Sequence, residues 1–171
     1  MTVRRWVLLI CFTGVASAQV LDSRMHHLRS GTEAEWSEFE ASVPEGKRLD
    51  IKFTSQPNKE ETTLFIRQID VKLDCNVELN GRKLGKLFLM EYPLVHSLKV
   101  PANTLRTGDN VLSILPPKEN DDIRVGDFRL GKMDATLEVQ ANQPCRITVA
   151  DAQGHLAALA ATNGRPGVIY T

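Results

Sequence analysis

Hydrophobic and polar residues alternate along much of the chain between residues 49 and 130, which is the pattern of half-buried β-strands. Apolar side chains recur at every second position in Leu49–Phe53 and again in Leu64–Ile66, on either side of a polar loop. Further strands are predicted at His96–Val100, Val111–Leu115 and Ile123–Leu130. About eight short strands separated by turn residues predict an all-β sandwich or jelly roll rather than alternating strands and helices.

A hairpin centred on Asn80-Gly81 is the clearest local signal. Val77 and Leu79 alternate with polar residues before the turn, and Leu84 follows it. Asparagine and glycine both tolerate the positive φ that a type I′ turn requires at its two central positions. The segment therefore predicts two antiparallel strands joined by a two-residue turn.

The residues on either side of this region have other patterns. Residues 19–46 are polar and interrupted by glycine and proline, so we expect an irregular lead-in with one helical turn at Thr32–Trp36. After Gly131, short apolar runs predict a small antiparallel meander that ends on Val168–Tyr170 with no later strand to cover it. We expect a β-sandwich with its lead-in at residues 19–133. Residues 134–171 are expected to form an incomplete carboxypeptidase-regulatory-like or fibronectin-like module, as in a fragment or the front of a longer protein.

Residues 1–18 have the three parts of an export signal. Arg4 and Arg5 form a positive start, Trp6–Val15 is apolar, and Ala16-Ser17-Ala18 matches an A-x-A cleavage site. The apolar run is shorter than the roughly 20 residues that a membrane-spanning helix needs, which argues against a membrane anchor. We therefore expect a mature chain that begins at Gln19, is secreted or periplasmic, and keeps no transmembrane anchor.

Charge and cysteine content narrow the partners. Without residues 1–18 the chain has 19 basic and 21 acidic residues, a net charge of −2, which argues against a nucleic-acid partner. An oxidising compartment permits a disulfide between Cys75 and Cys145. Because these cysteines fall in different predicted modules, two buried free thiols remain the alternative.

Few residues have the spacing that catalysis uses. The histidines form no His-x-His or HExxH motif and no G-x-S-x-G elbow is present, so an independent enzyme is not expected. His26 and His27 would point to opposite faces of a strand and so would not share one ion. Asp121 and Asp122 are candidate calcium ligands, because calcium prefers several oxygen ligands. The alternative for this acidic pair is a solvated loop.

Saccharide binding is the other chemistry for which the chain has candidates. β-Modules that bind sugars use exposed aromatic rings, with a few polar groups that fix orientation. Trp36 and Tyr92 are the candidate aromatics, and Glu91 lies beside Tyr92. Trp36 is surrounded in sequence by acidic residues and has capping of the core as its alternative role. An aromatic content of 6% argues against a sugar-binding surface.

Two elements resemble galactose-binding-like jelly rolls, which include sugar-binding domains of glycoside hydrolases. The run from Cys75 to Gly85 is similar to their V-x-L-N-G-x-x-L-G hairpin. A later P-x-x-x-L-x-x-G-x-N-x-L-x-I element is matched by Pro101, Leu105, Gly108, Asn110, Leu112 and Ile114. The resemblance implies the fold and leaves the ligand open.

A narrower resemblance rests on four segments, His26–Trp36, Arg67–Lys72, Asp121–Ile123 and Arg165–Val168. They resemble the N-terminal part of secreted CehA/McbA-type metallohydrolases, in which a similar β region precedes a PHP-type catalytic domain. No part of this sequence is similar to that catalytic domain, so the resemblance implies a non-catalytic accessory module. In this sequence Cys75 stands where an aromatic is expected.

Two functional hypotheses follow from these patterns and resemblances. In the first, the sandwich binds a saccharide or a cell-surface glycan. In the second, it is a scaffold that packs against a downstream hydrolase domain and has no ligand of its own.

Overall fold

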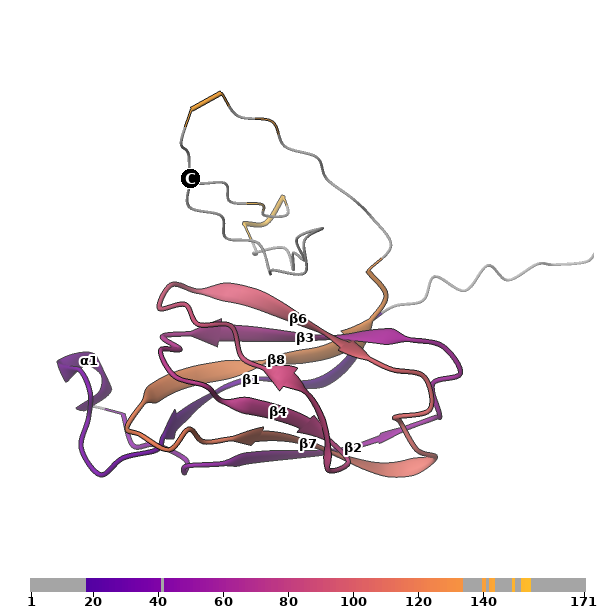
Figure 1. The fold of residues 1–171 in the computed structure, drawn as a ribbon, viewed down its shortest axis with the longest axis horizontal. Helices are drawn as coiled ribbons and strands as arrows, with labels where there is room; N and C mark the ends of the chain where they lie inside the picture. The colour runs from indigo at the N-terminus through magenta and orange to yellow at the C-terminus, as the bar shows by residue number, and fades with distance from the viewer. Residues whose placement is uncertain are drawn as a thin grey trace, which may run out of the picture.

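The computed structural model describes residues 18–40 and 42–133, together with residues 140, 142–143, 149 and 152–154. Its elements are β1 (Gln19–Arg29), α1 (Ser37–Glu40), β2 (Leu49–Ser55), β3 (Thr62–Ile69), β4 (Asn76–Leu79), β5 (Arg82–Lys86), β6 (Leu94–Val100), β7 (Gly108–Leu115) and β8 (Asp122–Gly131) (Figure 1). No helix among the described residues has the length and apolar character needed to cross a membrane. The export signal predicted at residues 1–18 lies outside the described residues except for Ala18, and so does nearly all of the second module predicted at residues 134–171.

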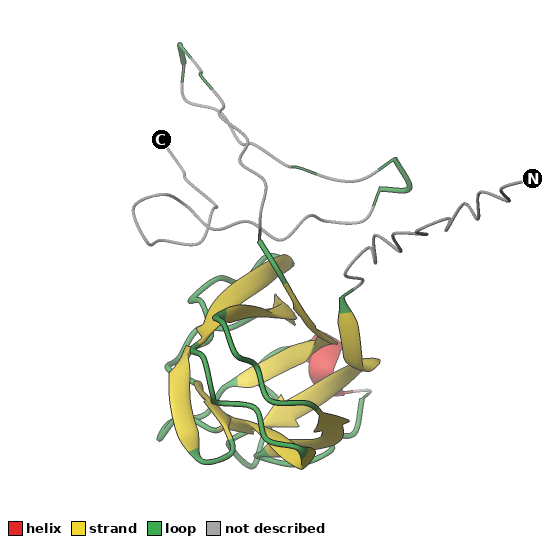
Figure 2. Cartoon of the chain, turned by 90° about the vertical axis from the view of Figure 1, so that its right-hand side faces the viewer, coloured by secondary structure: helices red, strands yellow, loops and turns green. Residues whose placement is uncertain are grey.

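The strands form two four-stranded antiparallel sheets, with the orders β1-β8-β3-β6 and β2-β7-β4-β5. Successive strands alternate between the sheets except at the β4–β5 hairpin, which is the connectivity of a jelly roll. Figure 2 shows the strands wrapped around the interior, with the short helix in red beside them. The all-β sandwich predicted from the alternating pattern is confirmed.

The core lies between the two sheets and is built from the inward positions of the predicted strands. Leu64 and Ile66 of β3 face Leu112 and Ile114 of β7, and Phe128 of β8 is fully buried. Because β-strand side chains alternate between faces, residues two apart enter the same core. Burial of such apolar side chains, worth about 1.5–3 kcal/mol each, is what holds the sheets together.

The predicted hairpin is confirmed and has a second role. Asn80 and Gly81 have φ values of 54° and 78°, both in the left-handed region. The Asn80 side chain accepts a hydrogen bond from the Val111 backbone N–H (3.0 Å) and donates to the Thr104 carbonyl (3.0 Å) and to Oδ1 of Asn110 (2.8 Å). Asn80 and Asn110, one from each of the two elements that resemble galactose-binding-like jelly rolls, therefore bind each other. Their contact fixes the β4–β5 turn against the start of β7.

The expectation of an irregular lead-in at residues 19–46 is wrong for the first eleven of these residues. Gln19–Arg29 form the edge strand β1, which pairs with β8 from Gln19 opposite Leu130 to Arg29 opposite Asp122. Two register shifts, near Asp22, break the alternation of side chains. The helical turn also forms later than expected, at Ser37–Glu40.

Candidate binding site

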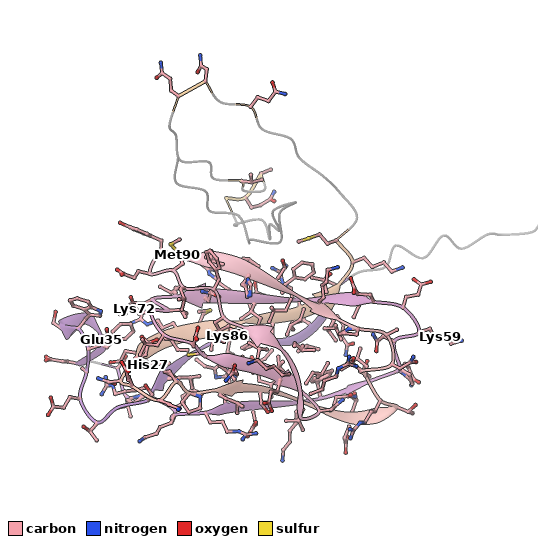
Figure 3. The ribbon with its side chains drawn as sticks, viewed as in Figure 1. His27, Glu35, Lys59, Lys72, Lys86 and Met90 are labelled. Atoms are coloured by element: carbon pink, nitrogen blue, oxygen red, sulfur yellow. The ribbon has the colours of Figure 1, made fainter. Side chains whose placement is uncertain are left out.

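The segment after β1 folds over the outer face of sheet β1-β8-β3-β6, at the end where β1 finishes and β8 begins. Phe39 of α1 is buried there, with its ring stacked on His27 (centroids 5.0 Å apart) and under the guanidinium of Arg124 (5.0 Å). His27 and Arg124 are directly opposite each other in β1 and β8. Figure 3 shows His27, Glu35 and Lys72 at this end of the sandwich and Lys59 at the other.

Asp122 anchors this segment to the sheet. Its buried carboxylate accepts hydrogen bonds from Arg29 Nε (2.8 and 3.0 Å), His27 Nε2 (2.8 Å) and the Glu35 backbone N–H (2.8 Å). Arg29 also donates from Nη2 to the Phe39 carbonyl (3.2 Å). Burial acts to raise the pKa of Asp122, but the bonds from Arg29, Glu35 and His27 together hold that pKa below its ordinary value.

A hydrogen-bonded chain of Ser42, His27 and Asp122 extends this anchor. His27 Nε2 donates to the ionised Asp122 at 2.8 Å, and Nδ1 of the same ring is hydrogen-bonded to the Ser42 hydroxyl at 2.9 Å. Sequence spacing gave no sign of this order of groups, because the residues come from three separate segments. The Ser42 backbone N–H is bonded to the Phe39 carbonyl (3.3 Å), so Ser42 is tied to α1 as well. These contacts fasten the α1 segment to β1.

The two adjacent histidines point to opposite faces of β1, as expected of strand neighbours. While His27 faces α1, His26 lies near the core residue Phe128, with ring centroids 6.3 Å apart. His26 bonds to Glu45 Oε2 through Nδ1 (2.8 Å) and lies 3.3 Å from Asp22 Oδ2 through Nε2. The two rings therefore have separate hydrogen-bond partners.

Asp121, the other half of the acidic pair, faces a different environment from Asp122. Its Oδ2 accepts from the backbone N–H groups of Leu73 (2.9 Å) and Lys72 (3.3 Å), while its Oδ1 has no hydrogen-bond partner. Burial raises the pKa of Asp121 to about 6, against the lowering effect of these two hydrogen bonds and of the Lys72 charge. Both aspartates are almost completely buried, so the solvated loop considered for them is wrong.

Calcium binding by Asp121 and Asp122 stays a prediction. Among the residues whose side chains the structure describes, no three candidate metal-ligating groups gather in one place. The two carboxylates bond to different donors, so they are not placed to share an ion.

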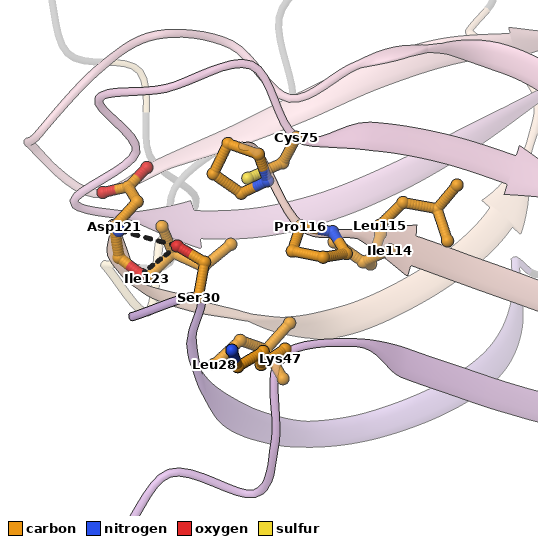
Figure 4. Close-up of a pocket in the computed structure, with 10 residues that line it drawn as sticks. Leu28, Ser30, Lys47, Cys75, Ile114, Leu115, Pro116, Asp121 and Ile123 are labelled. Carbon is orange, nitrogen blue, oxygen red and sulfur yellow. Dashed lines mark hydrogen bonds between the residues drawn. The ribbon is translucent and has the colours of Figure 1, made fainter. Parts of the chain in front are cut away.

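Cys75 is a buried cysteine close to Asp121, and it forms no disulfide with a described residue. Burial, with smaller contributions from the charges of Asp121 and Asp74, raises its pKa to about 12. It lines a cavity of about 10 Å³ with Asp121, Leu28 and other residues, where Ser30 bonds to the Asp121 backbone (Figure 4). Cys145 lies outside the described residues, so the disulfide stays a prediction.

Two open hollows lie at the α1 end and share one residue. The first, of about 420 Å³, is lined by Trp36, Phe39, Ile69, Asp70, Glu91 and Arg124. The second, of about 510 Å³, is lined by Val71, Lys72, Leu89, Met90, Glu91 and Tyr92. The structure thus brings together the three residues that the sequence suggested for ligand binding, with Glu91 between the two aromatics.

The rings of Trp36 and Tyr92 are accessible. Trp36 is 51% exposed and Tyr92 is 56% exposed, so about half of each side chain is open to solvent, and capping of the core by the covered half of Trp36 stays an alternative. Leu89, in the second hollow, is 51% exposed as well. Exposed large apolar side chains that gather at a hollow mark a surface for a ligand or a partner.

Lys72 organises the charges between the hollows. Its ammonium group lies 2.7 Å from Asp70 Oδ1, 3.2 Å from Glu35 Oε2 and 5.8 Å from the centre of the Trp36 ring. Desolvation acts to lower the pKa of Lys72, but the hydrogen bonds and charges of Asp70 and Glu35 raise it overall. The lysine is therefore held in place as a cation beside the indole.

Sequence reasoning missed Asp70, Lys72 and Arg124 as residues of the hollows. Asp70 and Lys72 belong to Arg67–Lys72, one of the segments that carry the narrower resemblance, and that was their one signal. Arg124 looks in the sequence like an ordinary outward-facing strand residue. Its place in the first hollow depends on α1 folding over β8.

Comparison with known proteins adds little to this description. No family model and no curated protein matches the chain. Among solved structures, the catalytic unit of a thermostable GH87 alpha-1,3-glucanase from Streptomyces thermodiastaticus strain HF3-3 matches with 12% identity and a TM-score of 0.31. The match covers 76% of this chain and 29% of the glucanase unit, so the chain spans less than a third of that structure. By its fold and this surface, the protein is a jelly-roll sandwich that has two adjoining open hollows at one end.

Proposed function

We propose that the sandwich is a non-catalytic binding module and that its ligand is a saccharide held at the α1 end. The observation that carries the proposal is the pairing of two half-exposed aromatic rings, Trp36 and Tyr92, with carboxylates and cations in adjoining hollows. A pyranose ring has apolar C–H faces that pack on aromatic rings and hydroxyl groups that both donate and accept hydrogen bonds. The hollows offer both kinds of partner.

The polar groups of the hollows suit an uncharged, hydroxyl-rich ligand. Asp70 and Glu91 offer acceptors, and Arg124 and Lys72 offer donors, so neither sign of charge prevails. Lys72 is fixed by its ion pairs, and Arg124 lies over the Phe39 ring. Groups that are already held in position lose less conformational entropy when a ligand binds.

The biological setting is inferred from the sequence. The export signal and the resemblance to the N-terminal part of secreted metallohydrolases support an accessory role in an exported, larger hydrolase-type protein. In that setting, the module would hold a glycan near a catalytic domain.

The scaffold hypothesis has one observation in its favour. Trp36, Leu89 and Tyr92 are exposed apolar side chains at the same end of the sandwich, and another domain that packed there would cover them. The same surface thus serves either hypothesis, and a direct binding experiment separates them.

A glycan-array screen of the chain from Gln19 to Thr171, with and without calcium, tests the proposal. We expect reproducible binding that Trp36→Ala or Tyr92→Ala weakens about threefold to tenfold, the value of one aromatic contact. Val20→Ala is the matched control, because Val20 is an equally exposed apolar residue (56%) at the far end of β1. A blank array from a chain that unfolds cooperatively would reject saccharide binding and favour the scaffold. Binding that requires calcium would support a calcium site.

A further inference from the structure

We propose, resting on the saccharide-binding function above, that the two hollows are consecutive subsites of one groove that binds a saccharide chain. One sugar unit packs against Trp36 and its neighbour along the chain packs against Tyr92, with Glu91 between them. The ligand class is therefore an oligosaccharide or the interior of a polysaccharide, and a single sugar fills half of the site.

The backbone between the hollows is continuous. Val71 and Met90 form an isolated antiparallel bridge with hydrogen bonds of 3.0 and 2.8 Å, and the Asp70 N–H donates to the Glu91 carbonyl at 2.9 Å. Asp70 and Glu91 line the first hollow, whereas Val71 and Met90 line the second. The same two backbone segments therefore run from one hollow into the other, with no other element between them.

Side chains also link the two hollows. Lys72, in the second hollow, is bonded to Asp70, in the first, at 2.7 Å, and its ammonium group also approaches the Trp36 ring. Glu91 lines both hollows and is exposed. A carboxylate with two oxygens at the boundary can accept hydrogen bonds from hydroxyl groups of two neighbouring sugar units at once.

Each hollow has the parts of a subsite. The first contains one exposed aromatic ring, two carboxylates and a guanidinium, and the second contains one exposed aromatic ring, an ammonium group and the shared carboxylate. The hollows, of about 420 and 510 Å³, are both open to solvent, so a chain can lie along them. The outer residues Leu89, Tyr92 and Pro93 are exposed, so a longer chain can continue past the groove.

The subsites are held by different parts of the fold. Trp36 follows Glu35, whose backbone N–H is bonded to the buried Asp122, so the first ring depends on the α1 segment. Tyr92 lies in the loop that leads into β6 at Leu94. The two aromatic rings therefore come from different segments of the chain, and each can be replaced by itself.

The test is the dependence of affinity on chain length. Dissociation constants are measured by calorimetry for gluco-, xylo-, manno- and galacto-oligosaccharides of one to four units, with α and β linkages. For the series that binds, we expect affinity to rise about tenfold or more from the single sugar to the short oligomers and then to level off. Loss of either ring should remove this gain, so that Trp36→Ala and Tyr92→Ala bind oligomers about as weakly as wild type binds the single sugar. Val20→Ala is expected to leave the whole series unchanged.

The outcomes separate the two proposals. Equal affinity for single sugars and oligomers would overturn the two-subsite groove but leave saccharide binding in place. The groove would also be overturned if Trp36→Ala and Tyr92→Ala each weakened the binding of a single sugar, since both rings would then contact one sugar unit. Failure of every probe to bind the folded chain would overturn both proposals.

Discussion

Replacing Asp122 with asparagine should unfasten the α1 segment, and the structure supplies the size of the effect. The guanidinium of Arg29, whose side chain is 13% exposed, would lose the one carboxylate with which it forms an ion pair among the described residues. The new amide also has one oxygen to meet donors from Arg29, His27 and the Glu35 backbone. Breaking a buried ion pair of this kind costs about 3–5 kcal/mol. That is a large share of the about 5–15 kcal/mol that stabilises a typical domain.

Urea unfolding followed by circular dichroism and tryptophan fluorescence measures this loss. With a urea dependence of about 2 kcal/mol per molar, the midpoint of Asp122→Asn should fall by about 2 M. Asp127→Asn is the matched control, because Asp127 pairs with Arg129 at 3.2 Å in the same strand but both side chains are about one third exposed. An exposed pair is worth at most about 1 kcal/mol. If Asp122→Asn costs no more than this control, the anchoring role is refuted.

Three further predictions concern the interior. The pKa of about 6 for Asp121 lies above its ordinary 3.8, so its contribution to stability is present below about pH 4 and lost as pH rises through 6. Asp121→Asn should therefore gain up to about 3 kcal/mol over wild type at pH 7.5 and none at acid pH, and urea titrations that show equal pH dependence would contradict this. Cys75, with a pKa of about 12, should resist iodoacetamide at pH 8 until urea is added, and the absence of a reactive thiol even in urea would instead reveal a bridge to Cys145. In Gly126→Ala the added carbon would lie 2.1 Å from the Arg24 carbonyl oxygen, so β1 must move and a loss of about 2–3 kcal/mol is expected; an unchanged thermal midpoint would count against the close β1–β8 approach.

The fold was predictable where a strand keeps one regular face toward the core. Leu64 and Ile66 alternate without interruption, and the β4–β5 turn is encoded in two adjacent residues. Strand β1 was missed because its register shifts near Asp22 break the alternation, and because its edge position leaves most of its side chains outside the core. A bulged edge strand made of polar residues has no regular alternation of apolar and polar positions, so its sequence does not reveal it.

The candidate site was predictable by residue type and not by arrangement. Aromatic residues make up only 6% of this chain, so Trp36 and Tyr92 stood out, and Glu91 was found as a neighbour of Tyr92. Arg124 gained its place only through the contact of α1 with β8. The burial of Asp122 was equally hidden, because an acidic pair in a sequence resembles a solvated loop until its distant partners are known.

The pairing of β1 with β8 also decides how the module joins whatever flanks it. Gln19 lies opposite Leu130, and Gly131 packs close to Ala18, so both connections leave from one end (Figure 1). The hollows lie by the other end of the same two strands, roughly 30 Å away at 3.3 Å per residue. A neighbouring domain, a purification tag or a surface linker attached at residues 18 and 132 would thus hold the sandwich at the end opposite the two hollows. The hollows would then face away from the point of attachment.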